Sequence, residues 1–348
     1  MHKSRIEWCE YTLNTVTGCR HGCPYCFASQ MTRRFSGNIS WNKAQTDKYT
    51  VRDGLYTLRE PFLDENGQEV VYPFGFEPTL HEYRTDTLKE IKMERNVFVG
   101  SMADLFGGWV PDEWILFTLG VCAKYPQHRY IFLTKNPKRY GKMQTFLPGG
   151  DHYWYGTTVT TEEEQDRIWE LPEGRHHFVS VEPILEKITL SIRNLESLDW
   201  IIVGAETGRR KGKVIPEKEW IDELVWEAEN YKTPVFMKDS LIPIVGEANM
   251  KREFPPALAK KVFSKKTMNR LYATCTECGK KYRRSEMVSL YARVGRSGPM
   301  KTICTMCRHC YTNWVSYHKL NGYVDELYGG IEDEEEKLPE DGGRGQDT

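Results

Sequence analysis

Short apolar runs recur along the first three quarters of the chain and alternate with amphipathic stretches. The runs are mostly continuous and rich in β-branched and aromatic residues, which is typical of strands covered on both faces. They comprise residues 11–18, 96–102, 129–135, 153–159, 177–183, 199–206 and 233–239. The stretches 111–126, 160–171 and 216–231 begin with proline or acidic residues, as helix N-termini prefer. This alternation predicts an α/β fold with a parallel sheet and right-handed crossovers.

The number of strand-like runs favours a complete or partial (β/α) TIM-like barrel over residues 1–258. A doubly wound dinucleotide-binding sheet is disfavoured, because no Gly-x-Gly-x-x-Gly turn opens the first unit. Residues 38–90 interrupt the pattern. Within them, residues 60–78 resemble a hairpin with its turn at 64–67. We expect an inserted hairpin there, which serves either as a lid or as packing decoration.

Polar residues follow the strand-like runs repeatedly. In a barrel of parallel strands the active site lies at the carboxyl ends of the strands. A single polar residue there is as readily a loop cap or a surface charge, but the recurrence favours a site. The candidates for contact with a polar ligand are Lys135, Glu182, Glu206, Lys238 and Asp239. Since buried charges are costly unless paired, we expect mixed-charge contacts among them.

A loop of three cysteines, "GCRHGCPYCFA", follows the first strand-like run. Cys19, Cys23 and Cys26 have the spacing Cys-x3-Cys-x2-Cys. A disulfide framework fits poorly, because it requires an even count in a secreted chain. Three thiolates could hold an iron–sulfur cluster with one open iron. The alternative is a zinc knuckle with Cys9 or His21 as the fourth ligand.

A second group of cysteines lies near the C-terminus, within residues 259–328. The pairs Cys275/Cys278 and Cys304/Cys307 have the pattern of a zinc ribbon, whose four thiolates close a tetrahedral site. Cys310 leaves an alternative open, because "CTMCRHC" also has the spacing of ferredoxin-type clusters. The sequence therefore predicts a small metal-binding domain that holds either zinc or an auxiliary iron–sulfur cluster.

The charge distribution is uneven although the net charge is only −1. Basic residues are interleaved with Tyr282 and Tyr291 around the second cysteine group, a composition that suits phosphate contact and base stacking. The candidate nucleic-acid contacts are Lys280, Lys281, Arg283, Arg284, Arg293 and Arg296. A solvated charged face is the simpler alternative. Residues 329–348 are acidic and Gly-rich, so we expect a disordered tail.

The cellular setting follows from the cysteines and the absence of long apolar runs. No run of about twenty apolar residues predicts a membrane span. The first ten residues lack the apolar core of a signal peptide. We therefore expect a cytoplasmic protein whose ten cysteines are reduced and mostly metal ligands. Cys122, within an apolar stretch, is expected to be a small core residue instead.

Several motifs together carry a resemblance over residues 5–255. The cysteine loop, "FVGSMADLFG", "IFLTKNPKR", "SVEPIL", "DWIIVGAETG" and "VFMKDSL" resemble those of an uncharacterised phage and bacterial family of the radical S-adenosylmethionine (SAM) type. The chain is also distantly similar to the spore photoproduct lyase branch of these enzymes. The resemblance implies a [4Fe–4S] cluster on Cys19, Cys23 and Cys26, with SAM bound at the open iron.

The resemblance also assigns residues to the cofactor. Tyr25 matches the aromatic position beside the SAM adenine, and Gly100, Ser101 and Met102 match the segment that meets the SAM amino group. The chain lacks the common Gly-Gly-Glu pattern there, which leaves Asp104 as an alternative contact. A reductant such as flavodoxin or ferredoxin would supply one electron, and a 5′-deoxyadenosyl radical would then act on a substrate.

Three functions remain open at this point. The first is a radical SAM enzyme acting on a nucleic acid or nucleotide. The second is a radical SAM enzyme acting on a peptide or small metabolite, with an auxiliary cluster near the C-terminus. The third is a non-enzymatic nucleic-acid-binding protein whose metals are structural. Iron and sulfide content separates the enzymes from the binding protein, and the metal at the second cysteine group separates the first two functions.

Overall fold

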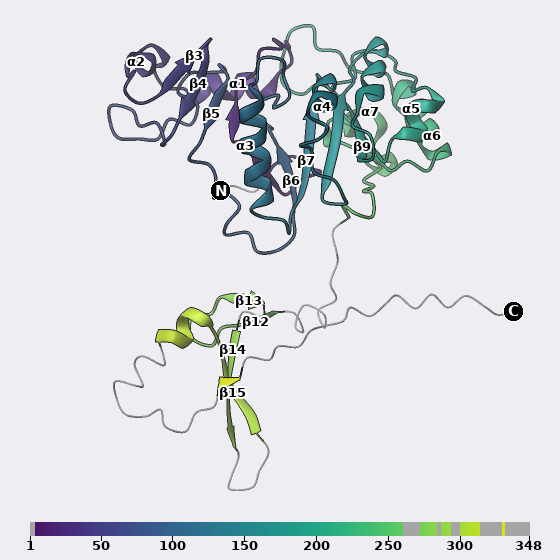
Figure 1. The fold of residues 1–348 in the computed structure, drawn as a ribbon. Helices are drawn as coiled ribbons and strands as arrows, with labels where there is room; N and C mark the ends of the chain where they lie inside the picture. The colour runs from purple at the N-terminus through teal and green to yellow at the C-terminus, as the bar shows by residue number, and fades with distance from the viewer. Residues whose placement is uncertain (1–3, 260–271, 284–286, 294–299, 314–328, 331–348) are drawn as a thin grey trace, which may run out of the picture. The chain divides into compact units, whose positions relative to one another are not determined.

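A parallel sheet of seven strands is the centre of residues 1–259, the first of two units into which the chain divides (Figure 1). The computed structural model describes residues 4–259, 272–283, 287–293, 300–313 and 329–330. The strand order is β1-β6-β7-β8-β9-β10-β11, and neighbouring strands are parallel throughout. The strands are β1 (Tyr11–Leu13), β6 (Asn96–Val99), β7 (Arg129–Thr134), β8 (Tyr153–Thr158), β9 (His176–Val181), β10 (Trp200–Val203) and β11 (Val235–Met237). The first unit is therefore a mixed α/β structure, as the alternation of apolar runs predicts.

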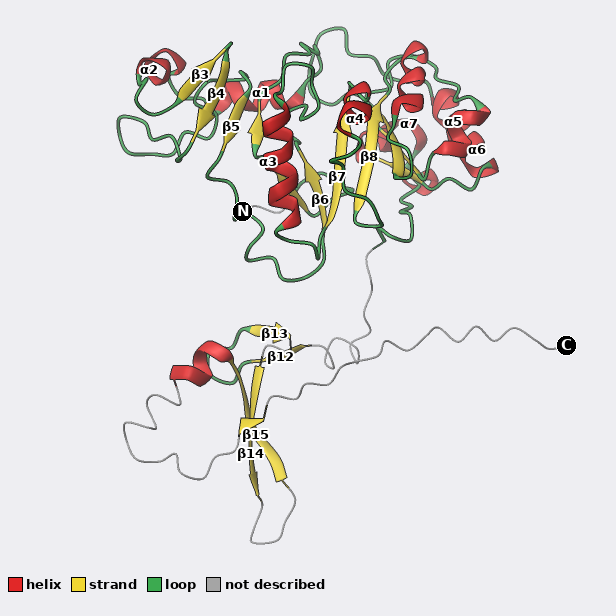
Figure 2. Ribbon diagram, viewed as in Figure 1, coloured by secondary structure: helices red, strands yellow, loops and turns green. Residues whose placement is uncertain are grey.

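Helices connect successive strands, as Figure 2 shows. They are α3 (Asp112–Ala123), α4 (Lys138–Met143), α5 (Ile192–Ser197) and α6 (Lys218–Asn230). The helix α7 (Ile242–Val245) and the short 3₁₀ helices η2 (Asp239–Leu241) and η3 (Glu247–Asn249) follow β11, the last strand of the sheet. The expected helix over 160–171 is instead the 3₁₀ helix η1 (Glu162–Glu170). Glu162 and Gln165 accept hydrogen bonds from the amides of Thr189 and Ser191, so contacts with a distant segment hold η1 in place.

No helix among the described residues is long and apolar enough to cross a membrane.

The two faces of the sheet carry separate apolar clusters, because successive side chains of a strand point to opposite faces. On one face, Val97 and Val99 of β6 pack in the same cluster as Ile115 and Leu119 of α3. On the other face lies a cluster rich in aromatic residues, made of Trp8, Cys9, Phe98, Ile131, Trp154, Phe178, Trp200, Ile202, Phe236 and Leu258. Both faces are therefore covered, which explains why the strands appear in the sequence as continuous apolar runs.

The sheet is curled around Trp8. In a flat sheet β6 and β10, four strands apart, would be separated by about 19 Å. Yet the Trp8 ring centroid lies 4.7 Å from that of Phe98 on β6 and 6.1 Å from that of Trp200 on β10. One side chain can contact both strands only if the sheet bends toward it. Among the described residues β1 and β11 do not pair, so the sheet is a half-barrel that stays open between its edges.

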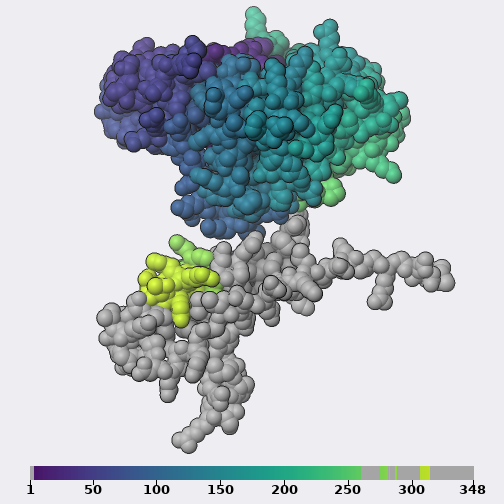
Figure 3. All heavy atoms as spheres, in the orientation of Figure 1, coloured from purple at the N-terminus to yellow at the C-terminus, as the bar shows by residue number. Residues whose placement is uncertain are grey.

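Residues 38–90 contribute to a smaller lobe at one end of the first unit, drawn in dark purple and blue in Figure 3. Its four-stranded sheet has the order β2-β5-β4-β3 and lies beside the helices α1 and α2. These elements are β2 (Val16–Thr17), β3 (Thr50–Arg52), β4 (Leu55–Leu58), β5 (Thr79–His81), α1 (Phe27–Arg34) and α2 (Ile39–Ala44). The hairpin expected over 60–78 is present in a short form around its turn at 64–67: Leu63 and Glu69 form an antiparallel bridge, the Val70 amide donates to the Phe62 carbonyl at 2.8 Å, and the Asp64 amide donates to the Gln68 carbonyl at 2.9 Å.

The regular hairpin of this lobe is β3–β4, which the sequence analysis missed. Its turn is Asp53–Gly54, and both residues have positive φ, 53° and 71°. Such a turn matches the twist of a two-residue hairpin and favours Asp-Gly. An Asp-Gly dipeptide between two runs of β-branched or aromatic residues therefore predicts this hairpin.

The second unit, residues 260–348, contains two small antiparallel sheets. They are formed by β12 (Tyr272–Thr274) with β13 (Lys281–Arg283), and by β14 (Met287–Arg293) with β15 (Met300–Cys307) and β16 (Gly329–Gly330). Residues 308–313 are helical. The expected acidic tail thus begins with two residues that pair with β14, and its remainder, 331–348, lies outside the described residues.

Candidate functional site

A cavity of about 290 Å³ opens at the carboxyl ends of the parallel strands. Its walls come from the cysteine loop, from the turns after β6, β7, β9 and β10, and from the end of β8. Ten of the residues singled out from the sequence line it together: Cys19, Cys23, Tyr25, Cys26, Gly100, Ser101, Asp104, Lys135, Glu182 and Glu206. The fold thus brings residues from distant parts of the sequence to one place.

Hydrogen bonds hold the cysteine loop at both of its ends. Gly18, with φ of +86°, donates its N–H to the Met102 carbonyl at 2.8 Å. A Cβ at this position would lie 2.2 Å from the Glu77 carbonyl oxygen, so only glycine fits. At the other end Cys26 is the N-cap of α1, and its Sγ accepts a hydrogen bond from the Ser29 amide at 3.4 Å.

Asp104 connects the cysteine loop to the sheet. Its Oδ1 accepts hydrogen bonds from Thr134 Oγ1 at 2.6 Å and the Phe106 amide at 3.1 Å. Its Oδ2 accepts one from the Lys135 amide at 2.9 Å and lies 2.7 Å from His21 Nε2. Because His21 lies between Cys19 and Cys23 in the sequence, this carboxylate fixes the middle of the loop over the ends of β6 and β7.

The thiols of Cys19 and Cys26 line the cavity and are partly buried. Burial raises the pKa of the Cys19 thiol to about 12 and also raises the pKa of Cys26. The thiolate is the form that ligates metals. A bound cation or cluster would therefore supply the positive charge that stabilises thiolates here.

The donor set fits a metal group that keeps one position open. Three cysteines line the cavity, and His21, one candidate fourth ligand, is engaged by Asp104. Cys9, the other candidate, packs in the apolar cluster around Trp8 and does not line the cavity. Among the described residues the three sulfurs do not belong to a group of ligand atoms within 4.8 Å of one another. That spread suits thiols bound to different irons better than thiols bound to a single ion.

Charged side chains form another part of the cavity wall. Lys238 is paired with Glu182, as the expectation of mixed-charge contacts requires. Gly204 leaves room for this glutamate, since a Cβ there would lie 3.1 Å from its side chain. Glu206 instead binds Arg210 through two hydrogen bonds of 2.7 Å, and these lower the pKa of the Glu206 carboxyl. The wall therefore presents carboxylates that are already balanced by cations.

Three of the predicted site residues do not line the cavity. Met102 is buried below the loop, where its carbonyl accepts from Gly18. Lys238 contributes only through its ion pair with Glu182. Asp239 points elsewhere: its carboxylate pairs with Arg252, and its amide donates to Glu7.

Residues that the sequence analysis missed complete the site. Asn14 donates a hydrogen bond to Ser101 Oγ at 3.1 Å and accepts one from the Met102 amide at 3.1 Å. It follows β1 directly, so the rule about carboxyl ends of strands would have found it. Thr134, at the end of β7, is another such residue. Arg210 was missed because its role depends on how the loop after Glu206 folds back.

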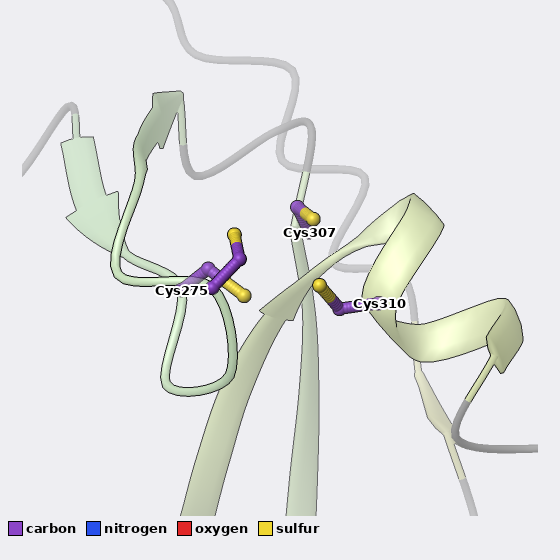
Figure 4. A group of neighbouring side chains, drawn as sticks. Cys275, Cys307 and Cys310 are labelled. Atoms are coloured by element: carbon purple, nitrogen blue, oxygen red, sulfur yellow. The ribbon is translucent and has the colours of Figure 1, made fainter.

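The second unit gathers four cysteines, shown in part in Figure 4. The sulfurs of Cys275, Cys278, Cys307 and Cys310 all lie within 4.8 Å of one another. Cys310, which the spacing offered as an alternative, completes this group. The expected ligand Cys304 belongs to β15, and its side chain lies outside the described residues.

Few of the expected nucleic-acid contacts fall on described side chains. Lys280 is exposed beside the second cysteine group. Lys281 and Arg283 belong to β13, and Arg293 belongs to β14. Arg284 and Arg296 lie outside the described residues. The basic stretch therefore remains a prediction from composition.

The fold and the site define a mixed α/β protein with a curled parallel sheet, a cysteine-lined cavity at its carboxyl edge and a four-cysteine group in a second unit. The family model of DUF5131, described as a protein of unknown function, matches residues 3–243. The chain belongs to this family. No curated protein matches it.

The solved structures that the chain resembles include several of spore photoproduct lyase. One single-residue variant of that enzyme matches 68% of this chain and 78% of its own, with 10% sequence identity and a TM-score of 0.40. Spore photoproduct lyase complexed with dinucleoside spore photoproduct matches 93% of this chain and 76% of its own, with 9% identity and a TM-score of 0.36.

Proposed function

We propose that this chain is a radical SAM enzyme with a [4Fe–4S] cluster on Cys19, Cys23 and Cys26. The observation that carries the proposal is the meeting of these three cysteines with polar residues in one cavity at the carboxyl edge of a parallel sheet. When bound, the cluster and SAM supply a 5′-deoxyadenosyl radical that takes a hydrogen atom from substrate. A reductant such as flavodoxin or ferredoxin would provide the electron.

The chain's own residues position the cofactors. Asp104 holds the cysteine loop through His21, so the thiols keep a fixed orientation toward the cavity. Tyr25 accepts a hydrogen bond from Lys135 Nζ at 3.1 Å, which fixes its ring at the cavity wall where the SAM adenine would pack. Ser101, oriented by Asn14, offers a hydroxyl to the SAM amino group.

The proposed substrate is a nucleic acid or nucleotide. Glu206 and Thr207 line the cavity, and the loop that follows carries exposed Arg209 and Lys211. Phe27, also in the cavity wall, is 63% exposed and could stack on a base. Cationic and aromatic groups at one opening suit phosphates and bases together. Lys135, Glu182 and Glu206 would contact the group that enters the cavity.

The test is anaerobic reconstitution of the full chain with iron and sulfide, followed by reduction in the presence of SAM. We expect about four irons at the first site, a change in the spectrum of the reduced cluster when SAM is added, and release of 5′-deoxyadenosine. Cys26→Ser should abolish all three. Ser101→Ala should leave the iron in place and weaken SAM binding.

Cys304→Ser is the matched control, because it removes a cysteine outside both the cysteine loop and the group Cys275, Cys278, Cys307 and Cys310. It should retain the iron and the 5′-deoxyadenosine. A wild-type protein that takes up no iron, or a reduced cluster that does not respond to SAM, would overturn the proposal.

A further inference from the structure

The four-cysteine group has the dimensions of a site for a single ion. Four ligands at the zinc–thiolate distance of about 2.3 Å in a tetrahedron are about 3.8 Å apart. The sulfurs of Cys275, Cys278, Cys307 and Cys310 lie within 4.8 Å of one another. The four thiolates of an iron–sulfur cluster are divided among two or more irons, so they cannot all stand this close together. Convergence of four thiols on one point therefore disfavours an auxiliary cluster.

The backbone around Cys275 and Cys278 forms a turn that aims both thiols the same way. The Cys275 amide donates to the Lys280 carbonyl at 2.9 Å, and the Gly279 amide donates to the Cys275 carbonyl at 3.0 Å. Gly279 has φ of +68°, a conformation that glycine adopts without strain. This turn lies between β12 and β13, so the two thiols are presented by a short hairpin-like loop.

The other two thiols come from a different sheet. Cys307 ends β15, where it pairs with Met287 of β14, and Cys310 lies in the helical residues 308–313. In Figure 4 the labelled side chains of Cys275, Cys307 and Cys310 point toward a common centre. An ion at that centre would connect the β12–β13 loop, the end of β15 and the following helix.

A small apolar cluster lies beside this group among the described side chains. Its buried members are Cys275, Met287, Met306 and Cys307, with Tyr282 and Tyr311 packed partly against them. Two of the four buried residues are thus members of the thiol group. A structural metal bound by these two residues would contribute folding free energy directly to this cluster.

We propose that Cys275, Cys278, Cys307 and Cys310 bind one zinc ion in a closed tetrahedral site that holds the second unit together. Four protein thiolates leave no open position, so the role is structural and not catalytic. Cys310, not Cys304, is the fourth ligand. All four ligands belong to the second unit, so this site is independent of the cluster proposed for the first unit.

The first test maps thiol reactivity on the full wild-type chain. Purified protein is treated with iodoacetamide, digested and analysed by mass spectrometry, before and after zinc is removed with a chelator. The informative residue is Cys278, which is exposed. An unligated exposed thiol is alkylated readily, whereas a zinc thiolate is protected. We expect protection of all four cysteines and its loss at Cys278 and Cys310 after chelation. Immediate alkylation of Cys278 in zinc-replete protein would overturn the proposal.

The second test compares two variants six residues apart, with metal content measured by mass spectrometry on the full chain. Cys310→Ser should lose the zinc, whereas the matched variant Cys304→Ser should retain one zinc ion per chain. A variant with Cys19, Cys23 and Cys26 all replaced by Ser should also retain it, which separates this site from the first. Loss of zinc in Cys304→Ser with retention in Cys310→Ser would overturn the ligand set. Iron in place of zinc in the triple variant would overturn the assignment of zinc to this site.

Discussion

Single polar residues decide how the cysteine loop meets the sheet. Asp104 binds four partners from three segments, so one carboxylate sets the height and orientation of the loop. His81 performs a similar task below the loop: its Nε2 lies 2.9 Å from Thr17 Oγ1 and its Nδ1 lies 3.2 Å from the Tyr83 hydroxyl. Both are buried polar groups whose hydrogen bonds are satisfied, which is the condition for tolerating them.

The protonation of His81 gives a prediction about pH. Burial, assisted by the Arg84 charge, lowers the pKa of His81 well below its usual value. As the pH falls below about 6.5, the unfolded chain gains a proton at this residue that the folded chain refuses. The free energy of unfolding should therefore be highest above this pH and decrease by about 1.4 kcal/mol per pH unit below it on account of His81.

Urea unfolding between pH 7 and pH 5 measures the contribution of His81, as the difference in pH dependence between wild type and a His81 variant. His81→Gln should show a shallower dependence on pH than wild type, although it is less stable at pH 7. Equal slopes in the two proteins would contradict the lowered pKa of His81.

At the scale of elements, the curl of the parallel sheet creates the site. Trp8 belongs to none of the strands, yet it fills the inner face between β6 and β10 together with Trp200 and Phe254. These aromatic side chains fill the inner face of the sheet, while the cavity lies at the carboxyl ends of the same strands. The strand ends approach one another because the sheet bends around an aromatic core.

Removing the Trp8 side chain should lower the free energy of unfolding. Trp8 is 3% exposed, and truncation of a buried aromatic side chain costs about 3–5 kcal/mol. We expect Trp8→Ala to lower the free energy of unfolding by that amount, measured by urea titration with circular dichroism. Trp226→Ala is the control, because Trp226 is 64% exposed on α6 and should change stability little. Similar losses in the two variants would contradict the role assigned to Trp8.

At the scale of the whole molecule, the second unit differs from the rest of the chain by its local excess of positive charge. Residues 260–320 contain 14 Lys and Arg against two Glu, although the chain as a whole carries a net charge of −1. Such a local excess favours contact with phosphates, whose counterions are released on binding. The proposed zinc site would keep this basic segment folded.

Salt dependence tests this contact. The affinity for single-stranded DNA or RNA should fall as salt rises, with a linear relation between the logarithms. Replacing Arg283 and Arg284 with Gln should weaken binding and reduce the slope by about 1.4, if each contacts one phosphate of the single strand. Lys89→Gln with Lys92→Gln makes the same change of charge in the first unit and should leave the slope unchanged. Binding that does not depend on salt would identify the basic stretch as a solvated face.

The sequence by itself determined the strands and most of the cavity wall. Continuous apolar runs located all seven strands of the sheet, because strands covered on both faces must be apolar at successive positions. The polar residues after these runs, such as Ser101, Lys135 and Glu182, line one cavity because parallel strands end at the same edge. Both predictions depend only on the order of apolar and polar residues along the chain.

Tertiary structure decided the remainder. Arg210 pairs with Glu206, and Asp239 turns away to Arg252, because loop paths choose partners that spacing does not specify. The order "CTMCRHC" allows two overlapping cysteine pairs, and only the fold shows that Cys310 joins Cys307 beside Cys275. Trp8 lies far in sequence from the strands it contacts, so the curl of the sheet had no local indication. Contacts between distant segments depend on the packed chain, and for that reason no local pattern could reveal them.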